Sequence, residues 1–190
     1  MKQAGVRASM RITGGEFRGR NLAVPPGARP TEGRVREALF SIWSGRLDGA
    51  RVLDLFAGSG AVGLEAAGRG ALTVLCVDES VPAVKTLEAN AARLGEGLVE
   101  IRRLHLPPGL ARLVSEGIGP FDLVYADPPY NFAPYDELLA GVAPLLAADA
   151  EVAVEHASRR SLPVEVGGLV RVDSRRYGEG TVSFYRRGPN

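Results

Sequence analysis

The sequence predicts an α/β fold in which a mostly parallel sheet is covered by helices on both faces. Short apolar stretches alternate with amphipathic ones between residues 50 and 156, and buried strands separated by helices are typical of parallel sheets. This alternation ends in "GLVRVDSRRYGEGTVSFYRR", where two strand-like runs flank Tyr177-Gly178-Glu179-Gly180 with no helix between them. That pair predicts an antiparallel hairpin at the end of the chain.

The composition is that of an ordinary globular protein. The 190 residues are 45% hydrophobic and 24% charged, which suits one domain with a small appendage. No apolar stretch is long enough to cross a bilayer, and the polar start "MKQAGVRAS" has no hydrophobic signal-peptide region. The single cysteine, Cys76, excludes an internal disulfide and a cysteine zinc cluster. We therefore expect a cytoplasmic protein without a metal ion or a membrane partner.

The first fifty residues predict a small appendage to the sheet. The stretch "MRITGGEFRGRNLAVP" alternates loosely around Gly14-Gly15, so a short β-hairpin is expected from about Arg11 to Val24. A stiff loop, "PPGARPTEG", follows. The next stretch, "GRVREALFSIWSGRL", has apolar residues at helical spacing and predicts a helix. Residues 1–9 are expected to be a flexible extension.

The rest of the chain predicts alternating strands and helices. We expect strands at 50–56, 72–78, 98–104, 121–127 and 150–156, helices at 60–70, 81–95, 108–117 and 135–146, and the hairpin at 168–187. Seven strands in this order resemble the Rossmann-like, doubly wound sheet of class I methyltransferases, in which the last strand is inserted antiparallel.

A glycine loop follows the first strand of the predicted sheet. Gly58-Ser59-Gly60 stands where strand becomes helix, and such sheets bind ligands beyond the carboxyl ends of their strands. With Gly63 the loop also matches the dinucleotide pattern G-x-G-x-x-G. Asp54 disfavours a diphosphate and suits the ammonium group of S-adenosylmethionine. Asp78, at the end of the second strand, can accept ribose hydroxyls of either cofactor. The predicted cofactor-binding residues are Asp54, Phe56, Ala57, Gly58, Ser59, Gly60, Asp78 and Glu79.

The stretch "YADPPY" ends the fourth strand with a rigid corner. Two adjacent prolines exclude a helix or an interior strand. The Asp127 carboxylate and the Pro128 carbonyl can accept hydrogen bonds from an amino group, with Pro129 stiffening the corner and Tyr130 stacking on a base. The quartet resembles the Asp/Asn-Pro-Pro-Tyr/Phe motif of methyltransferases that act on amino groups of nucleobases or glutamine. Asp127 to Tyr130 are the predicted catalytic residues.

Basic residues are concentrated at the N-terminus. Residues 1–51 carry ten basic and four acidic side chains, a net charge of +6, and the remainder of the chain carries −5. Nine of those ten cations are arginine, whose planar guanidinium suits phosphate contacts. The pattern favours a nucleic-acid partner or, equally, an arginine-rich solvated surface.

Five stretches together resemble the RsmD-type bacterial methyltransferases, which methylate the guanine N2 of 16S ribosomal RNA. They are "MRITGGEFRGRNLAVP", "ARPTEGRVREALFSIW", "VLDLFAGSGAVGLEA", "YADPPY" and "YGEGTVSFYRR". The resemblance runs from Met10 to about Arg187. It implies S-adenosylmethionine as methyl donor and a monomer that acts on 16S rRNA in an assembling small subunit. It further implies a basic RNA-binding hairpin and helix at 10–48 and a methyltransferase domain at 49–190. The RNA-contacting residues would be Arg11, Arg18, Arg20, Arg29, Thr31, Arg34 and Arg36.

The sequence departs from the family pattern at two places, and three alternative functions stay open. In the loop Thr31-Glu32-Gly33, the acidic residue stands at a different position from the one that it has in the family pattern. Leu104-His105 replaces an acidic or amide residue expected near the cofactor adenine, so that the adenine is held by backbone alone, by His105, or less tightly. The alternatives are methylation of adenine N6 in DNA, methylation of glutamine N5 in a protein, and a non-catalytic rRNA-binding Rossmann protein.

Overall fold

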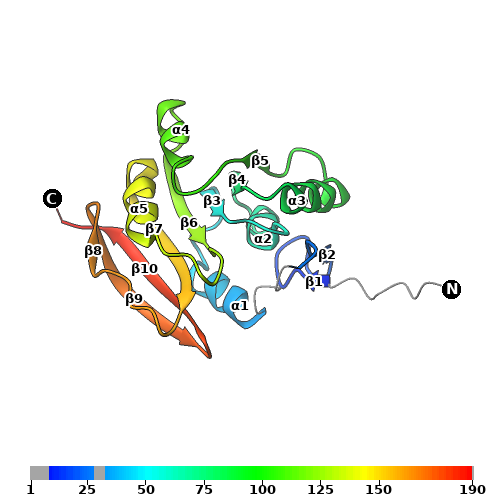
Figure 1. Ribbon diagram of the computed structural model, residues 1–190. Helices are drawn as coiled ribbons and strands as arrows, with labels where there is room; N and C mark the ends of the chain where they lie inside the picture. The colour runs from blue at the N-terminus through cyan, green and yellow to red at the C-terminus, as the bar shows by residue number, and fades with distance from the viewer. Residues whose placement is uncertain (1–8, 28–32, 190) are drawn as a thin grey trace.

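The computed structural model describes residues 9–27 and 33–189, in which one large sheet is flanked by helices and a two-stranded sheet lies beside them (Figure 1). The predicted extension at 1–9 therefore lies almost entirely outside the described residues, as does most of the predicted loop at 25–33. The two-stranded sheet pairs β1 (Ser9–Arg11) with β2 (Asn21–Ala23), which agrees with the predicted N-terminal hairpin.

The large sheet has eight strands in the order β5-β4-β3-β6-β7-β10-β9-β8. Its strands are β3 (Arg51–Leu55), β4 (Thr73–Asp78), β5 (Glu100–Arg103), β6 (Phe121–Ala126), β7 (Leu146–Ala157), β8 (Glu165–Val166), β9 (Leu169–Tyr177) and β10 (Gly180–Arg187). The five strands from β5 to β7 pair in parallel, as predicted. The order reverses between β3 and β6, which makes that boundary the place where such a sheet binds ligands.

The C-terminal hairpin is confirmed, with β10 inserted antiparallel between β7 and β9. The sheet has one strand more than the seven predicted. The extra strand, β8, is two residues long and pairs with β9 across Gly167-Gly168. Both glycines have positive φ, 58° and 78°, which is the backbone of a two-residue hairpin turn.

Five α-helices and one 3₁₀ turn complete the fold over residues 9–27 and 33–189. They are α1 (Gly33–Ile42), α2 (Ala61–Gly68), α3 (Val81–Leu94), α4 (Leu110–Ser115), α5 (Tyr135–Val142) and the 3₁₀ turn η1 (Ala143–Leu145). The helix expected at 135–146 is shorter than predicted because Pro144 cannot continue an α-helix, and β7 begins at Leu146.

The helices divide between the two faces of the sheet. One core cluster joins β1, β2, α1, α2 and α3 to the sheet through residues such as Val52 and Tyr125. The other joins α4 and α5 to the opposite face through neighbours such as Leu53 and Val124. Figure 1 shows α4 and α5 together on one side and α1 on the other. Because side chains alternate along a strand, the continuous apolar runs read from the sequence cover both faces.

A buried carboxylate fastens the N-terminal hairpin to α2. Glu65 is fully buried and accepts from the Thr13 amide and hydroxyl at 3.0 and 2.6 Å. It also pairs with Arg36 Nε at 3.2 Å and Arg69 Nη2 at 2.7 Å. A buried charge is tolerated when it is paired and hydrogen-bonded, so this cluster fixes where the hairpin and α1 sit.

A second polar residue joins the hairpin to the glycine loop. The buried Asn90 side chain exchanges hydrogen bonds with the Ala23 backbone in β2, both at 2.9 Å. Its amide also donates to the Ser59 carbonyl at 2.9 Å. The hairpin is thus attached directly to the loop expected to bind the cofactor.

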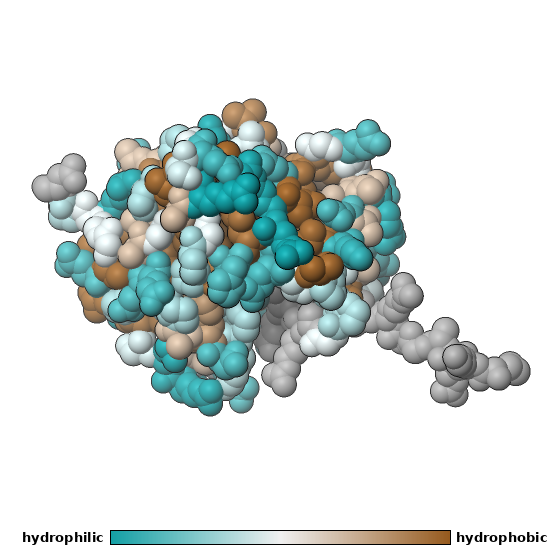
Figure 2. All heavy atoms as spheres, turned by 45° about the horizontal axis from the view of Figure 1, so that its top comes forward, coloured by the Kyte–Doolittle hydropathy of each residue, from teal (hydrophilic) through white to brown (hydrophobic). Residues whose placement is uncertain are grey.

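The surface is mixed in character. On the face shown in Figure 2, hydrophilic and hydrophobic residues are interspersed, as on most protein surfaces. Within residues 9–27 and 33–189, no helix is both long enough and apolar enough to cross a membrane.

Candidate active site

A cleft of about 850 Å³ opens at the carboxyl ends of β3, β4 and β6. Strands from both sides of the reversal in strand order contribute to it, which is where the fold favours a binding site. All but one of the predicted cofactor and catalytic residues line it. They are Asp54, Phe56, Ala57, Gly58, Ser59, Asp78, Glu79, Asp127, Pro128, Pro129 and Tyr130.

Gly60 is the exception, because it lies on the side of the loop that packs against α3. It begins α2 in the left-handed conformation, with φ of 79°. A Cβ added there would lie 1.9 Å from Leu87 Cδ1 on α3. Gly58 also has positive φ, 57°, but an added Cβ would meet nothing closer than the Phe56 carbonyl oxygen at 4.0 Å. Gly58 is therefore the glycine at which a ligand can approach the backbone.

Asp54 is a buried carboxyl in the cleft wall. It is 1% exposed, and its Oδ2 accepts a hydrogen bond from the Gly63 amide at 2.9 Å. Burial raises its pKa to about 7, a rise opposed by the Gly63 hydrogen bond and reinforced by the nearby Asp78 charge. The charge of this group thus changes near neutral pH.

Asp78 links the loops that follow β3 and β4. One of its oxygens accepts from the Gly58 amide and the other from the Ser80 amide, each at 2.9 Å. A carboxylate oxygen has two lone pairs, so both oxygens retain acceptor capacity towards hydroxyl groups in the cleft. This is the arrangement that the predicted ribose contact requires.

The Asp127–Tyr130 corner is held from both sides. The Asp127 amide lies 3.4 Å from the Leu55 carbonyl of β3, and the Phe132 amide donates to the Pro129 carbonyl at 2.8 Å. The Phe132 ring packs edge-on against Phe56, with ring centroids 5.2 Å apart. These contacts fix the corner beside the glycine loop.

Tyr130 leaves its ring largely uncovered. It is 62% exposed, and the Arg159 guanidinium lies 4.6 Å from its ring centroid. An exposed ring with a cation over one face can accept a flat base by stacking.

Sequence reasoning missed two side chains at the end of β7, Glu155 and His156. Both line the cleft. Tyr125 donates to Glu155 Oε2 at 2.7 Å, and His156 Nε2 lies 2.8 Å from Ser183 Oγ. Burial lowers the pKa of His156. The available signal was their position, because both end the predicted strand "AEVAVEH" at the same sheet edge as Asp78 and Asp127.

The region expected near an adenine ring contains a contact between two exposed side chains. His105 Nδ1 contacts Glu79 Oε2. Glu79 lines the cleft, whereas His105 is 74% exposed and lies outside the lining. His105 therefore contacts a residue of the cleft without lining the cleft itself.

The predicted RNA-contacting residues have different environments. Arg11, Arg18, Arg20 and Arg34 are exposed. Arg11 and Arg18 lie along a depression of about 570 Å³ between the hairpin and α1. Arg29 and Thr31 lie outside the described residues.

Arg36 does not fit the predicted RNA contact. It is 2% exposed, and its guanidinium is engaged by Glu65 and by the Arg11 carbonyl. Its position within the N-terminal arginine cluster could not reveal this, because the partner carboxylate belongs to α2. We assign it the role of holding α1 against α2.

Comparison with known proteins gives consistent matches over nearly the whole chain. The profile of the family described as "Conserved hypothetical protein 95" matches residues 10–186. The "Putative rRNA methyltransferase YlbH" of Bacillus subtilis (strain 168) is 32% identical over 183 residues, which is 94% of this chain and 99% of the relative.

Two further matches come from Escherichia coli. The "Ribosomal RNA small subunit methyltransferase D" of strain K12 is 39% identical over 124 residues, 64% of this chain and 61% of the relative. A solved structure named "Putative methyltransferase yhhF" superposes with a TM-score of 0.82 at 32% identity, covering 95% of this chain and 98% of that one.

Proposed function

This chain belongs to the family of RsmD-type ribosomal RNA methyltransferases, and from that membership we propose that it methylates the exocyclic N2 amine of a guanine in 16S rRNA. The methyl donor in this proposal is S-adenosylmethionine, and the RNA is part of an assembling small subunit. One observation carries the proposal: the glycine loop of β3 and the Asp127–Tyr130 corner of β6 line a single cleft.

The residues of the cleft fit the polar groups of that donor. S-adenosylmethionine supplies an electrophilic methyl group on a sulfonium and presents an ammonium group and two ribose hydroxyls. Ionised Asp54 suits the ammonium, and Asp78 suits the hydroxyls. The backbone at Gly58 is open to close approach, with no Cβ in the way.

Asp127 and Pro128 would activate the amine by orienting it. The nitrogen lone pair of a base amine is delocalised into its ring, which makes it a poor nucleophile. The amine donates hydrogen bonds to the Asp127 carboxylate and the Pro128 carbonyl. These hydrogen bonds localise the lone pair on the nitrogen and direct it into the cleft. Most of the rate gain then comes from positioning, with an electrostatic contribution as positive charge develops on the nitrogen. That nitrogen loses its proton readily, so no strong base is required.

Exposed arginines near the cleft would position the RNA. Arg11, Arg18 and Arg20 lie on the hairpin, which is joined to the glycine loop through Asn90, and Arg34 lies on α1. Contacts of this kind bind phosphates without reading sequence. The base itself has to leave its stack to reach Tyr130.

The proposal is tested by methyl transfer to small subunits from a strain that lacks the gene. The purified protein is incubated with these particles and S-adenosylmethionine carrying an isotopic label, and the rRNA is digested for mass spectrometry. We expect one labelled N2-methylguanosine in 16S rRNA. Label in adenine, in DNA or in a glutamine side chain would reassign the substrate. Absence of label from every substrate, with S-adenosylmethionine binding lost in calorimetry, would favour a non-catalytic RNA-binding protein.

A further inference from the structure

Two carboxylates stand side by side at the substrate end of the cleft. β6 and β7 are parallel, with Ala126 opposite Val154, so Asp127 and Glu155 follow at the same level on adjacent strands. Neighbouring strands lie about 4.8 Å apart. Both residues line the cleft, and both charges act on the Tyr125 and Tyr135 phenols.

Glu155 is held in place as a hydrogen-bond acceptor. The Tyr125 hydroxyl donates to its Oε2 at 2.7 Å. Burial raises the pKa of Tyr125 well above its ordinary value, and the charges of Asp127 and Glu155 raise it further. The phenol therefore stays protonated and continues to donate. The Oε1 atom lies towards Gly180, where an added Cβ would be 3.4 Å away.

Guanine presents two adjacent donor groups that match such a pair. Its N2 amine stands beside the ring N1–H, so that edge offers donors to both carboxylates. Adenine and cytosine place an acceptor nitrogen beside their amine, and a glutamine amide places its carbonyl there. A second carboxylate next to Asp127 would repel each of those acceptors, and a site whose polar group is left unpaired rejects such analogues strongly.

We propose that Glu155 is the specificity-determining residue of this site and that it selects guanine by accepting a hydrogen bond from N1–H while Asp127 holds the N2 amine. This inference rests on the proposed function and deepens it. No covalent step involves Glu155, which only binds the edge of the base.

The test compares guanine with 2-aminopurine at the target position of an RNA or reconstituted subunit that supports turnover. 2-Aminopurine keeps the C2 amine but has a lone pair at N1. The wild-type protein should prefer guanine. In Glu155→Gln the amide can donate to that lone pair, so the guanine to 2-aminopurine ratio of kcat/KM should fall about tenfold or more. The absent O6 of 2-aminopurine affects both proteins equally and cancels in the comparison.

Glu179→Gln is the matched control, because Glu179 also lines the cleft and the change removes the same charge. Its guanine to 2-aminopurine ratio should equal that of the wild type. Tyr125→Phe, which removes the donor to Glu155, should lower the ratio part of the way towards that of Glu155→Gln. A merely structural role for Glu155 would lower turnover on both bases and leave the ratio unchanged.

Equilibrium binding keeps the test decisive if Glu155→Gln has no turnover. The fluorescence of 2-aminopurine reports stacking of the base, so competition between the two RNAs gives the same ratio from dissociation constants. A Glu155→Gln protein with the wild-type ratio by either measurement overturns the role of Glu155. A wild-type protein that methylates no guanine overturns the proposed function instead, and the two failures are therefore distinct.

Discussion

Asp54 shows how one buried residue can set the pH response of a binding site. Its pKa of about 7 follows from burial, partly offset by the Gly63 amide. Below that pH the side chain is a neutral acid, and above it the side chain is a carboxylate that can pair with an ammonium group.

We therefore predict that affinity for S-adenosylmethionine weakens as the pH falls below 7. Between pH 7 and 5.5 the dissociation constant should rise about 15-fold in total, because the ionised fraction of a group with a pKa of about 7 falls by that factor over this range. Isothermal titration calorimetry across this range measures it. Asp54→Asn should bind weakly at every pH, whereas Asp48→Asn, at an exposed carboxyl, should keep the wild-type profile. A wild-type profile in Asp54→Asn would mean that another group titrates.

Asp127 gives the second prediction at this scale. Asp127→Asn keeps the shape of the side chain but replaces a charged acceptor by a weaker one that also donates. We expect kcat to fall by about 100-fold or more, in the range found when one transition-state hydrogen bond is removed. The dissociation constant for S-adenosylmethionine should stay within about threefold, since the predicted cofactor contacts lie on β3 and β4. Single-turnover kinetics and calorimetry separate the two effects, with exposed Glu137→Gln as control. Normal turnover in Asp127→Asn would refute the role given to this carboxylate.

How far single residues could be predicted depends on where their partners lie in the chain. Asp54, Asp78 and Asp127 each end or nearly end an apolar strand, and the carboxyl ends of parallel strands meet at one sheet edge, so their common cleft follows from local patterns. The hydrogen-bond partners of Glu155 and Arg36 cannot be inferred from such local patterns. Tyr125 is 30 residues from Glu155, and their contact depends on the pairing of β6 with β7, which the sequence does not specify directly.

At the scale of secondary-structure elements, the position of α2 depends on a glycine in its first turn. An added Cβ at Gly63 would lie 2.4 Å from Cys76 Sγ and 3.2 Å from Asp54 Oδ2. Glycine thus allows α2 to approach β3 and β4 closely, and this approach brings the Gly63 amide to Asp54.

Gly63→Ala should therefore push α2 away from the sheet. We expect the free energy of unfolding to fall by about 1–3 kcal/mol, as for other overpacked cores, and S-adenosylmethionine to bind more weakly. Urea denaturation and calorimetry measure the two quantities. Gly33→Ala is the matched control, because Gly33 begins α1 and an added Cβ there meets nothing within 4 Å. Equal stability of the two variants would show that α2 does not need this close approach.

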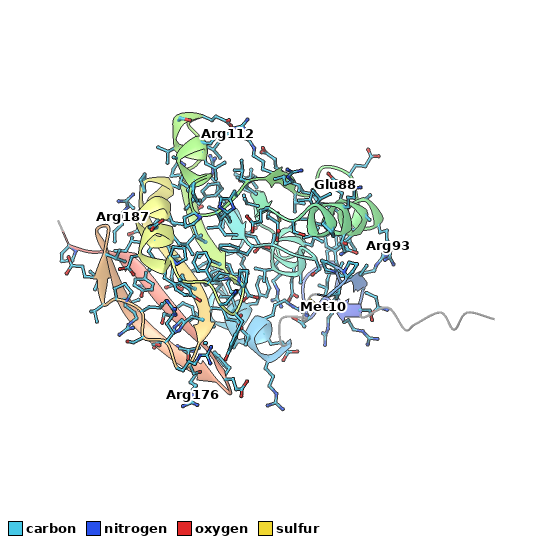
Figure 3. The ribbon with its side chains drawn as sticks, viewed as in Figure 1. Met10, Glu88, Arg93, Arg112, Arg176 and Arg187 are labelled. Atoms are coloured by element: carbon cyan, nitrogen blue, oxygen red, sulfur yellow. The ribbon has the colours of Figure 1, made fainter. Side chains whose placement is uncertain are left out.

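At the scale of the whole molecule, the hairpin that carries exposed arginines is joined by Asn90 to the loop that lines the acidic cleft. Figure 3 labels Met10 in the N-terminal hairpin and Arg112 on α4, and these two elements pack against opposite faces of the sheet. If the hairpin and α1 bind RNA, phosphate contacts should be confined to the Met10 side.

We predict that RNA affinity falls steeply with salt and that each contacting arginine contributes to the slope. Arg18→Ala and Arg20→Ala should each reduce the slope of log K against log salt concentration by about 0.7–0.9, the value for one phosphate contact. Filter binding between about 50 and 300 mM salt, on both sides of physiological ionic strength, measures it. Arg112→Ala should leave the slope unchanged. An equal loss in all three variants would indicate diffuse attraction instead of a defined RNA-binding face.

The central sheet was more predictable than its short edge strand and the 3₁₀ turn. Apolar strands alternating with helices gave five parallel strands and a hairpin, because that pattern is set by burial on both faces of a sheet. The two-residue β8 was missed because so short a strand carries no periodic signal. The 3₁₀ turn at Ala143–Leu145 was missed because the apolar pattern of 135–146 continues through Pro144.

The Asn90 side chain has a consequence for how the binding of RNA and of the methyl donor is coupled. This one side chain donates hydrogen bonds both to β2 of the hairpin proposed to bind RNA and to Ser59 of the loop proposed to bind the methyl donor. Binding of either ligand is therefore expected to order the part of the site that the other ligand contacts. Thermodynamic linkage then requires that each ligand raise the affinity of the other by the same factor. Titrating each ligand with and without its companion should give one shared factor, and Asn90→Ala should bring that factor to unity.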